Sequence, residues 1–328
     1  MVLNESSVLE RVRASARVGS VAGGRKLSFR AMGTTCQITL MDEPGIDSRE
    51  FFEAALQWVS AFEERYSRFL PDSLISRINQ AAGGDWVTVD EETDRLLSMC
   101  QELHFFTRGA FDPTALPLLL LWNWKARPPV IPDDAKIRAA MELVGWRKIL
   151  RRPGAIRLPR KGMGIDLGGI GKEYAVDRVA QLAHEHGIRN VLVDFGQDIR
   201  ATGRPLGRSV WHVGLQDPQQ PERCWTGVAV QNMAVATSGD YFRRFELNGR
   251  RYGHILDPRS GYPVANDCRA VSVVASTCTF AGALCTSAFI LGAQEGFQLL
   301  ENYYGAEGCM LTDTSNIQTR RFNEYLTH

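Results

Sequence analysis

The sequence predicts an α+β fold in which helices are mixed with mainly antiparallel strands. Several segments repeat apolar residues at helical spacing, shorter apolar runs are typical of strands, and Asn248-Gly249 is the strongest short-range signal of a hairpin. These elements do not alternate regularly as strand and helix, which argues against a parallel α/β sheet. The 328 residues include 44% hydrophobic and 23% charged ones, a globular composition.

Helices are predicted where apolar residues recur every three or four positions. These segments cover residues 48–66, 91–106, 133–145, 171–186, 279–291 and 294–304. Asp47 or Ser48 is expected to cap the first helix, because both side chains can accept hydrogen bonds from free backbone N–H groups. Gly187, Gly292 and Gly305 each follow a periodic segment and are expected to end it.

Strands are predicted in the remaining apolar runs. They cover residues 29–40, 191–193, 210–215 and 227–236, besides the hairpin at Asn248-Gly249. The first is expected to be interrupted at Met32-Gly33. We expect a flexible lead-in over residues 1–26 and one folded domain over residues 27–328.

Charge and cysteine content exclude several classes of protein. The net charge of +1, from 38 basic and 37 acidic residues, gives no electrostatic reason to expect a nucleic acid or an anionic membrane as the main partner. The longest apolar run, residues 115–122, is too short to span a bilayer. Seven cysteines without a CxxC pair suit reduced, buried thiols. No signal peptide is visible, which predicts a cytoplasmic protein, although a periplasmic protein trimmed of its leader would look the same.

A glycine-rich turn precedes the helix predicted at residue 171. Gly168, Gly169 and Gly171 would let a ligand approach the backbone at a helix N-terminus, and Lys172 could neutralise a phosphate there. The turn is neither a dinucleotide fingerprint nor a P-loop. A tight strand-to-helix turn without a ligand is the alternative.

His254 lies between the hairpin and Asp257-Pro258. It is either a core or surface histidine, or a general base beside a phosphate site, because imidazole titrates near neutral pH. Asp257 would orient the histidine or simply cap the following turn.

Three other turns carry polar or soft groups with two interpretations each. Ser238-Gly239 offers a hydroxyl and an N–H at a strand end, or is an ordinary turn. Asp112 stops a helix, or binds the polar edge of a ring. Met32 fills the core, or forms a soft surface beneath a planar ligand.

Taken in order, these stretches resemble a known family. AMGTT, SRFLPDSLISRIN, GAFDPTALPLLLLW, GIDLGGIGKEYAVDRVA, VATSGDYFRR, HILDPRSGYPV and CTFAGALCTSAFILG together are similar to the ApbE-like FAD:protein FMN transferases, over roughly residues 27–320. The resemblance implies a two-lobed fold with an FAD cleft between the lobes. It also implies transfer of FMN from FAD, with Mg²⁺, to a Thr or Ser hydroxyl of a client flavoprotein, with release of AMP.

The resemblance also implies roles for individual residues. His254 would be the base, with Asp257 beside it, and Gly171, through its carbonyl, and Thr286 would bind the metal. The residues implied in FAD binding are Met32 beneath the isoalloxazine ring, Phe69, the flavin-pocket residues Ala110, Phe111 and Asp112, the pyrophosphate turn with Asp166, Gly168 and Lys172, then Tyr174, Ser238, Gly239 and Leu256.

The chain departs from the family pattern in the closing helix. The pattern is Ala-Asp-Ala-x-x-Thr, whose Asp and Thr share one helical face as magnesium ligands, whereas this chain has Gly282 at the Asp position and keeps Thr286. A hard cation needs oxygen ligands, and a mid-helix glycine costs about 1 kcal/mol, which suggests that the space beside Gly282 is needed for something. Glu173 replaces a common glycine and is expected to be exposed at the start of its helix.

Three interpretations follow. The chain is a transferase whose metal is held by other oxygens, such as those of Asp166, Asp194 or Asp198 and of water. Alternatively it is an FAD-binding relative, a carrier or partner protein, that has lost transfer. The third is FAD pyrophosphate cleavage. If the site is poor in metal ligands, Gly282→Asp is expected to tighten Mg²⁺ binding.

Overall fold

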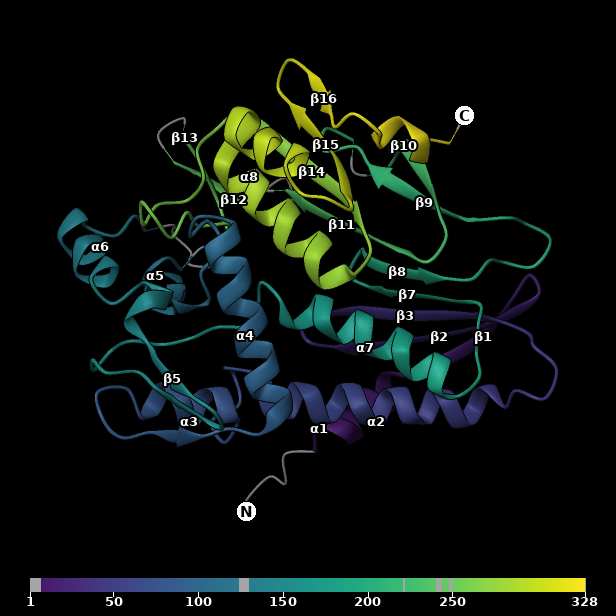
Figure 1. Ribbon diagram of the computed structural model, residues 1–328, viewed down its shortest axis with the longest axis horizontal. Coiled ribbons are helices and arrows are strands. Elements are labelled where there is room, and N and C mark those ends of the chain that lie inside the picture. The colour runs from purple at the N-terminus through teal and green to yellow at the C-terminus, as the bar shows by residue number, and fades with distance from the viewer. Residues whose placement is uncertain (1–6, 124–129, 221, 240–243, 248–249, 328) are drawn as a thin grey trace.

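A nine-stranded sheet forms the centre of the molecule (Figure 1). The computed structural model describes residues 7–123, 130–220, 222–239, 244–247 and 250–327. Every neighbouring pair in the sheet is antiparallel, which together with the mixed helices confirms the predicted α+β class. In spatial order the strands are β1 (Arg17–Val21), β2 (Gly24–Ala31), β3 (Thr34–Met41), β7 (Val191–Phe195), β8 (Asp198–Thr202), β11 (Met233–Gly239), β14 (Cys268–Ala275), β15 (Ala306–Thr312) and β16 (Asn316–Gln318).

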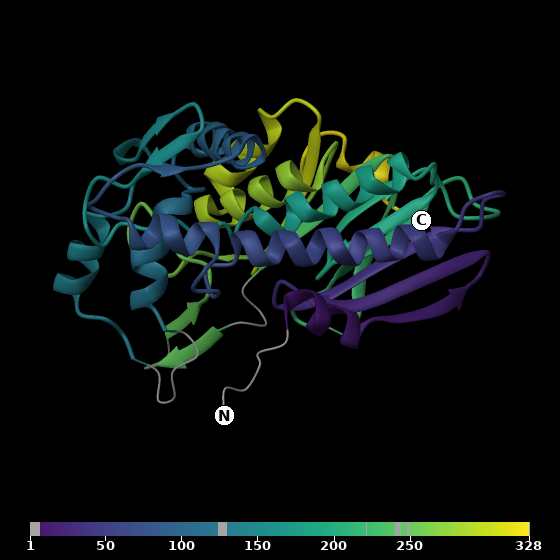
Figure 2. The same cartoon turned by 90° about the horizontal axis from the view of Figure 1, so that it is seen from below.

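Three long helices cover one face of this sheet, as the view of Figure 2 shows. They are α2 (Ser48–Tyr66), α7 (Gly171–Glu185) and α8 (Cys278–Glu301). Their apolar residues and those of the facing strands form the main core, because alternate residues of each strand point to the same side. A two-stranded sheet of β9 (Trp211–Gln216) and β10 (Cys224–Val230) packs through a second core that includes Ile199, Val235 and Val274 of the central strands.

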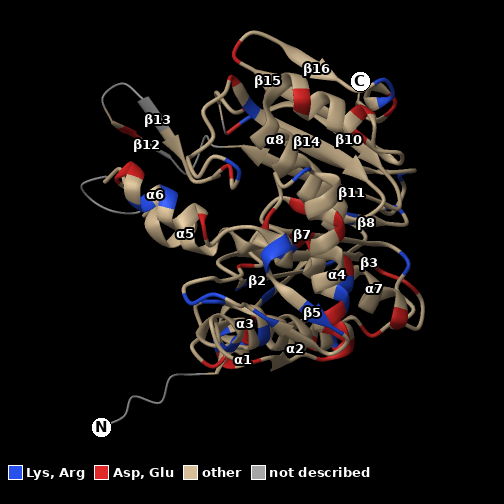
Figure 3. Cartoon of the chain, turned by 60° about the vertical axis from the view of Figure 1, so that its left-hand side comes forward, with Lys and Arg blue, Asp and Glu red and all other residues tan. Residues whose placement is uncertain are grey.

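The second lobe combines helices with a small three-stranded sheet. It contains α3 (Leu74–Gln80), α4 (Glu91–Phe106), α5 (Leu116–Leu121), α6 (Asp134–Met141) and a small sheet of β4 (Val87–Thr88), β6 (Ala155–Arg157) and β5 (Leu150–Arg152). The hairpin of β12 (Arg244–Leu247) and β13 (Arg250–Gly253) joins α5 and α6 through a third core, in which Tyr252 stacks 6.1 Å from Trp122. Figure 3 shows these elements together and charges of both signs spread over the molecule. The hairpin brings the start of the 254–264 loop to this lobe.

The N-terminal segment corrects the expectation of a flexible lead-in. Over residues 7–26 the chain forms α1 (Val8–Ser15), closed by a capping box between Ser7 and Glu10, then β1 and the start of β2. Only Val8 and Val12 of α1 are buried, so its apolar pattern is too short to be recognised from the sequence.

Two predicted strands are each divided by a turn into two separate strands. Residues 29–40 belong to β2 and β3, joined at Met32 and Gly33, whose φ angles of 49° and 71° form the two-residue turn that matches the twist of paired strands. Residues 227–236 divide between β10 and β11 at Asn232, with φ 55°. In both places an apolar run continues through a turn that needs only one or two left-handed residues.

The remaining predictions of helices are close to the structure. The bounds of α2 and α4 agree with the sequence, and Asp47 caps α2 by accepting the N–H of Arg49. The two closing helices are one element, α8, with a break at Gly292 (φ 79°), while α6 ends before Gly145. Asn248-Gly249 lies outside the described residues. Among the helices that the structure describes, none is long and apolar enough to cross a membrane.

Candidate active site

The N-terminus of α7 presents a helix start that no side chain caps. Gly168 and Gly169 are exposed immediately before it, and Ile170 occupies the cap position without a side-chain hydrogen bond. The N–H of Gly168 donates to Asp166 Oδ1 at 2.9 Å, while Arg68 Nε donates to Oδ2 of the same carboxylate at 2.8 Å. A helix start of this kind suits a phosphate, because its N–H groups and its dipole favour negative charge.

Two buried acids share one lysine in the first turn of α7. Lys172 Nζ lies 3.1 Å from Glu173 Oε1 and also pairs with the carboxylate of Asp198 at the start of β8. Glu173 and Asp198 are 7% and 6% exposed. Glu173 is therefore buried, which corrects the expectation that it is exposed. Its second oxygen, Oε2, has no hydrogen-bond partner among the residues that the structure describes.

A hydroxyl group of β11 contacts a hydroxyl and a thiol of α8. Ser238 Oγ lies 2.7 Å from Thr286 Oγ1 and 3.0 Å from Cys285 Sγ. Burial raises the pKa of Cys285 to about 11, and the negative charge of Glu173 contributes to that shift, which places the carboxylate within electrostatic reach of the cluster. Gly239, the last residue of β11, pairs with Ala270 in the sheet.

Glu173 also occupies the space beside Gly282. A Cβ atom on Gly282 would lie 2.5 Å from Glu173 Cγ and 3.2 Å from Cδ, far inside normal contact. The sequence indicated this residue only indirectly: Gly282 lacks the acid of the family pattern, and position 173 has gained one. Neither departure by itself indicates that Glu173 lies against Gly282.

The other acids considered as metal ligands already have protein partners. Asp166 binds Arg68 and the Gly168 N–H, Asp194 accepts the N–H of Gln197 at 2.8 Å, and Asp198 pairs with Lys172. Burial raises the pKa of Asp194. No group of three or more His, Cys, Asp or Glu side chains in the described part of the chain is arranged to hold a metal by itself.

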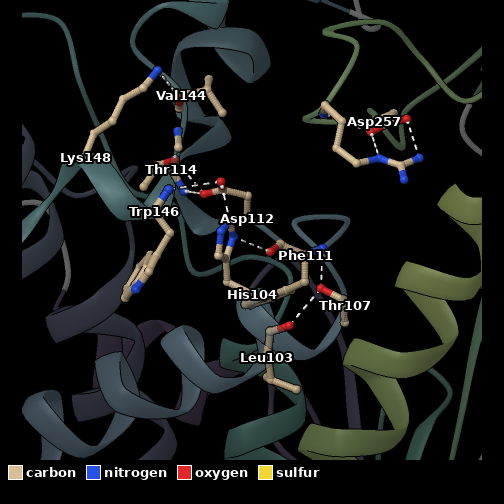
Figure 4. A network of polar contacts seen from close by, with 12 residues as sticks. Leu103, His104, Thr107, Phe111, Asp112, Thr114, Val144, Trp146, Lys148 and Asp257 are labelled. Atoms are coloured by element: carbon tan, nitrogen blue, oxygen red, sulfur yellow. Dashed lines mark hydrogen bonds and ion pairs between the residues drawn. The ribbon is translucent and has the colours of Figure 1, made fainter. Parts of the chain in front are cut away.

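Asp112 fixes the end of α4 to the segment around Trp146 (Figure 4). Its carboxylate accepts the N–H and the hydroxyl of Thr114 at 2.8 and 2.5 Å and the N–H of Trp146 at 3.1 Å, with His104 Nδ1 at 3.4 Å. The side chain is 4% exposed. These bonds support the helix-stop interpretation of Asp112.

The stretch around Asp112 nevertheless adjoins the glycine turn. Ala110 and Phe111 are buried, and Phe111 Cε2 lies 3.6 Å from where a Cβ on Gly169 would be. The N–H of Asp166 donates to the carbonyl of Pro113 at 2.8 Å. Segments far apart in the sequence therefore meet at the start of α7.

A cavity of about 590 Å³ separates the Asp112 segment from the loop after β13. Its lining includes Gly109, Asp112 and Arg147 on one side and Pro258 and Arg259 on the other. Asp112 of the predicted flavin-pocket segment and two residues of the loop after His254 therefore line one hollow.

The loop that follows half-buried His254 is rigid. Val264 N–H donates to the Ile255 carbonyl at 3.0 Å, and Leu256 pairs with Pro263 in a β-bridge. Trp122 Nε1 donates to the Gly261 carbonyl at 2.8 Å, which ties the loop to α5. Neither Trp122 nor that anchor was suggested by the sequence patterns.

Asp257 serves the turn. Both of its carboxylate oxygens accept hydrogen bonds from Arg259, from Nε and Nη2 at 2.9 Å each, and Oδ1 also accepts the Arg259 N–H at 2.9 Å. The turn-capping interpretation is therefore the one the structure supports, and an orienting contact to His254 is not needed to explain Asp257.

Three aromatic or soft residues of the predicted site have different settings. Met32, in the β2–β3 turn, donates its N–H to Glu63 Oε2 at 2.8 Å. Phe69 is 77% exposed, with the Arg68 guanidinium 4.2 Å from its ring centroid. Burial raises the pKa of Tyr174 to about 12, and its hydroxyl donates to Glu92 at 3.2 Å. Phe69 is thus an exposed aromatic surface, whereas the hydroxyl of Tyr174 is fixed by its hydrogen bond to Glu92.

The fold defines a class: a two-lobed α+β protein built around an antiparallel central sheet. Comparison with known proteins identifies the family. The ApbE family model matches residues 32–310, and the chain belongs to that family.

Individual relatives are similar over most of their length. A FAD:protein FMN transferase of Vibrio cholerae is 31% identical over 279 residues, covering 84% of both chains. One of Treponema pallidum is 31% identical over 300 residues, covering 85% of this chain and 82% of its own. Among solved structures, the flavin transferase ApbE from Vibrio cholerae has a TM-score of 0.84 at 28% identity, over 95% of this chain and 100% of that one. The ApbE protein of Thermotoga maritima has a TM-score of 0.85 at 30% identity, over 93% and 100%.

Proposed function

We propose that the chain is a FAD:protein FMN transferase, which moves FMN from FAD to a Thr or Ser hydroxyl of a client flavoprotein and releases AMP. The observation that carries this proposal is the uncapped start of α7, with exposed Gly168-Gly169 before it and Lys172 in its first turn. The Ser238–Thr286 hydroxyl pair joins β11 to α8, the helix that packs on α7. Membership of the ApbE family, whose relatives bear that name, supports the same activity.

The binding roles follow the arrangement of the site. The pyrophosphate of FAD would lie at Gly168 and the first N–H groups of α7, with Lys172 as counter-charge. The flavin would lie against the 110–112 segment and the adjoining cavity, and Met32, Tyr174 and exposed Phe69 would offer it soft or aromatic surface. Ser238-Gly239 and Leu256 would close over the cofactor.

The reaction needs a proton acceptor beside the incoming hydroxyl. In the proposed step the hydroxyl oxygen attacks the phosphorus on the FMN side of the pyrophosphate, the bond to the AMP phosphate breaks, and AMP leaves. His254 takes the proton of the hydroxyl, and the rigid loop, with Asp257 holding its turn, keeps the imidazole in place. The N–H groups of α7 stabilise charge on the phosphates as the bond breaks.

Mg²⁺ fits the donors present at this place. Hydroxyl, carbonyl and carboxylate oxygens are its preferred ligands, and Oε2 of buried Glu173, which has no hydrogen-bond partner in the part of the chain that the structure describes, is a position that a cation would satisfy. We propose the Thr286 hydroxyl and the Gly171 carbonyl among its ligands. When bound, the metal neutralises charge on the phosphates.

The test is AMP release and covalent flavin on a threonine-containing peptide of a client, from FAD, with and without Mg²⁺. His254→Ala is expected to abolish flavin attachment while FAD binding is retained; His212→Ala, an exposed histidine on β9, is the control. AMP release without flavin attachment would instead establish pyrophosphate cleavage. Tight FAD binding without AMP would establish a flavin-binding relative. Either result would refute the transferase.

A further inference from the structure

We propose that Glu173 of α7 supplies the carboxylate ligand for Mg²⁺ that Gly282 of α8 cannot supply, so that the acidic ligand has moved from one helix to the facing one. The inference rests on the proposed function, because FAD phosphates complete the metal's coordination. It concerns residues of this chain only and departs from the pattern of the family, in which the acid lies at position 282.

The two helices approach so closely here that only one of the two positions can carry a side chain longer than that of alanine. The position of a Cβ on Gly282 is 2.5 Å from Glu173 Cγ and 3.4 Å from Glu173 Cβ, so the glutamate already fills that space. Thr286 follows Gly282 by one helical turn and shares its face. The Glu173 side chain therefore passes over the surface that an acid at position 282 would have occupied beside Thr286.

Glu173 also has an oxygen free for a ligand. Its side chain is 10% exposed, Lys172 binds Oε1, and Oε2 has no donor within the described ranges. A buried carboxylate oxygen without a donor is costly, because it loses its hydration without a replacement. A metal ion would supply the missing partner.

The charges of Lys172, Glu173 and Asp198 do not balance, and their excess is negative. Lys172 is shared between Glu173 and Asp198, so one ammonium faces two buried carboxylates and one negative charge remains. Mg²⁺ is usually held by one or two carboxylates together with substrate phosphates and water, rather than by a cage of side chains. This habit agrees with the lack of a three-ligand cluster in the described residues.

The experiment measures metal binding directly, with Mn²⁺ as a paramagnetic substitute for Mg²⁺. FAD-loaded protein is titrated with Mn²⁺, and the free ion is followed by electron paramagnetic resonance. Glu173→Gln keeps the shape of the side chain and is expected to weaken Mn²⁺ binding at least tenfold, while FAD affinity changes less than threefold. The control Glu185→Gln removes a carboxylate from the exposed end of the same helix and is expected to change nothing.

The exchanged variant, Glu173→Gly with Gly282→Asp, restores the family arrangement and is expected to recover Mn²⁺ affinity to within threefold of the wild type. Gly282→Asp alone keeps the clash with Glu173, so the expectation that it tightens Mg²⁺ binding by itself is revised. Should the exchanged variant not fold, as judged by circular dichroism, the comparison of Glu173→Gln with Glu185→Gln decides alone.

Wild-type Mn²⁺ affinity in Glu173→Gln would overturn the inference, as would a wild-type protein that binds FAD without Mn²⁺. The proposed function is judged separately by flavin transfer. If the wild type transfers flavin with Mg²⁺ and Glu173→Gln binds Mn²⁺ as tightly as the wild type, the assignment of Glu173 as a ligand is refuted and the proposed function stands. If Mn²⁺ binding depends on Glu173 but no flavin is transferred, the proposed transferase function is refuted and the ligand assignment stands.

Discussion

Replacing Gly282 with alanine tests how tightly α7 and α8 pack at the candidate site. In an ordinary helix interior, Gly→Ala stabilises a protein by about 1 kcal/mol. Here the new methyl group would lie 2.5 Å from Glu173 Cγ, in the middle of a side chain that is 7% exposed and tied to Lys172. Overpacking a buried position costs about 1–3 kcal/mol, so we expect a net loss of about 1 kcal/mol.

The contribution of Glu173 can be isolated by a double-mutant cycle. In a Glu173→Ala background the clash is gone, and Gly282→Ala is expected to stabilise by about 1 kcal/mol, which makes the coupling energy about 2 kcal/mol. The assay is thermal unfolding, in which 1 kcal/mol shifts Tm by about 2–4 °C for a large domain. Gly171→Ala is the control, because its Cβ would lie 3.7 Å from the nearest atom, an ordinary contact.

The steric reasoning fails if Gly282→Ala raises Tm equally in both backgrounds. That result would mean that Glu173 does not fill the space beside Gly282, and it would remove the structural basis for the exchange of ligand positions.

Three further predictions concern the frame around the site. Asp177 accepts the N–H groups of Cys278 and Thr279 at 2.8 Å each, so Asp177→Ala is expected to destabilise the protein by about 2–4 kcal/mol, with Asp177→Asn intermediate in a urea titration. Gly261 has φ 83° and little space for a Cβ, so Gly261→Ala is expected to loosen the His254 loop and lower flavin transfer more than FAD binding; equal losses would contradict this. Cys224 is exposed and the other six cysteines are buried, and burial raises the pKa of Cys36, Cys100, Cys278, Cys285 and Cys309, so a thiol reagent at pH 8 is expected to modify one thiol per native chain and all seven after denaturation.

Long amphipathic helices were predictable because their signals are local. The apolar spacing and the caps of α2 and α4 predict their bounds from the sequence, and the glycine at position 292 marks the break within α8. Hairpins were harder to predict from the sequence than helices. The β2–β3 turn at Met32-Gly33 interrupts an apolar run without a polar cluster, and only the pairing of the two strands distinguishes it from a bent strand.

The candidate site was predictable as a set of segments and not as a set of contacts. The glycine turn, the 110–112 stretch and the His254 loop were recognised by their order along the chain, and the structure brings the first two into contact. The hydrogen-bond and ion-pair partners of the acidic side chains could not be predicted from the sequence. Arg259 takes the carboxylate of Asp257, and Lys172 is shared by two acids, one of them from a distant strand.

The sequence by itself determined the fold class, the family and the helix that begins after a glycine-rich turn, because periodicity, caps and motif order are properties of neighbouring residues. Only the tertiary structure decided what replaces the missing acid in α8. Glu173 and Gly282 are far apart in the chain, and no local sequence pattern indicates that they lie side by side. Packing of α7 on α8 makes them share one space, since the absence of a side chain on one helix is what lets the carboxylate of the other be buried there.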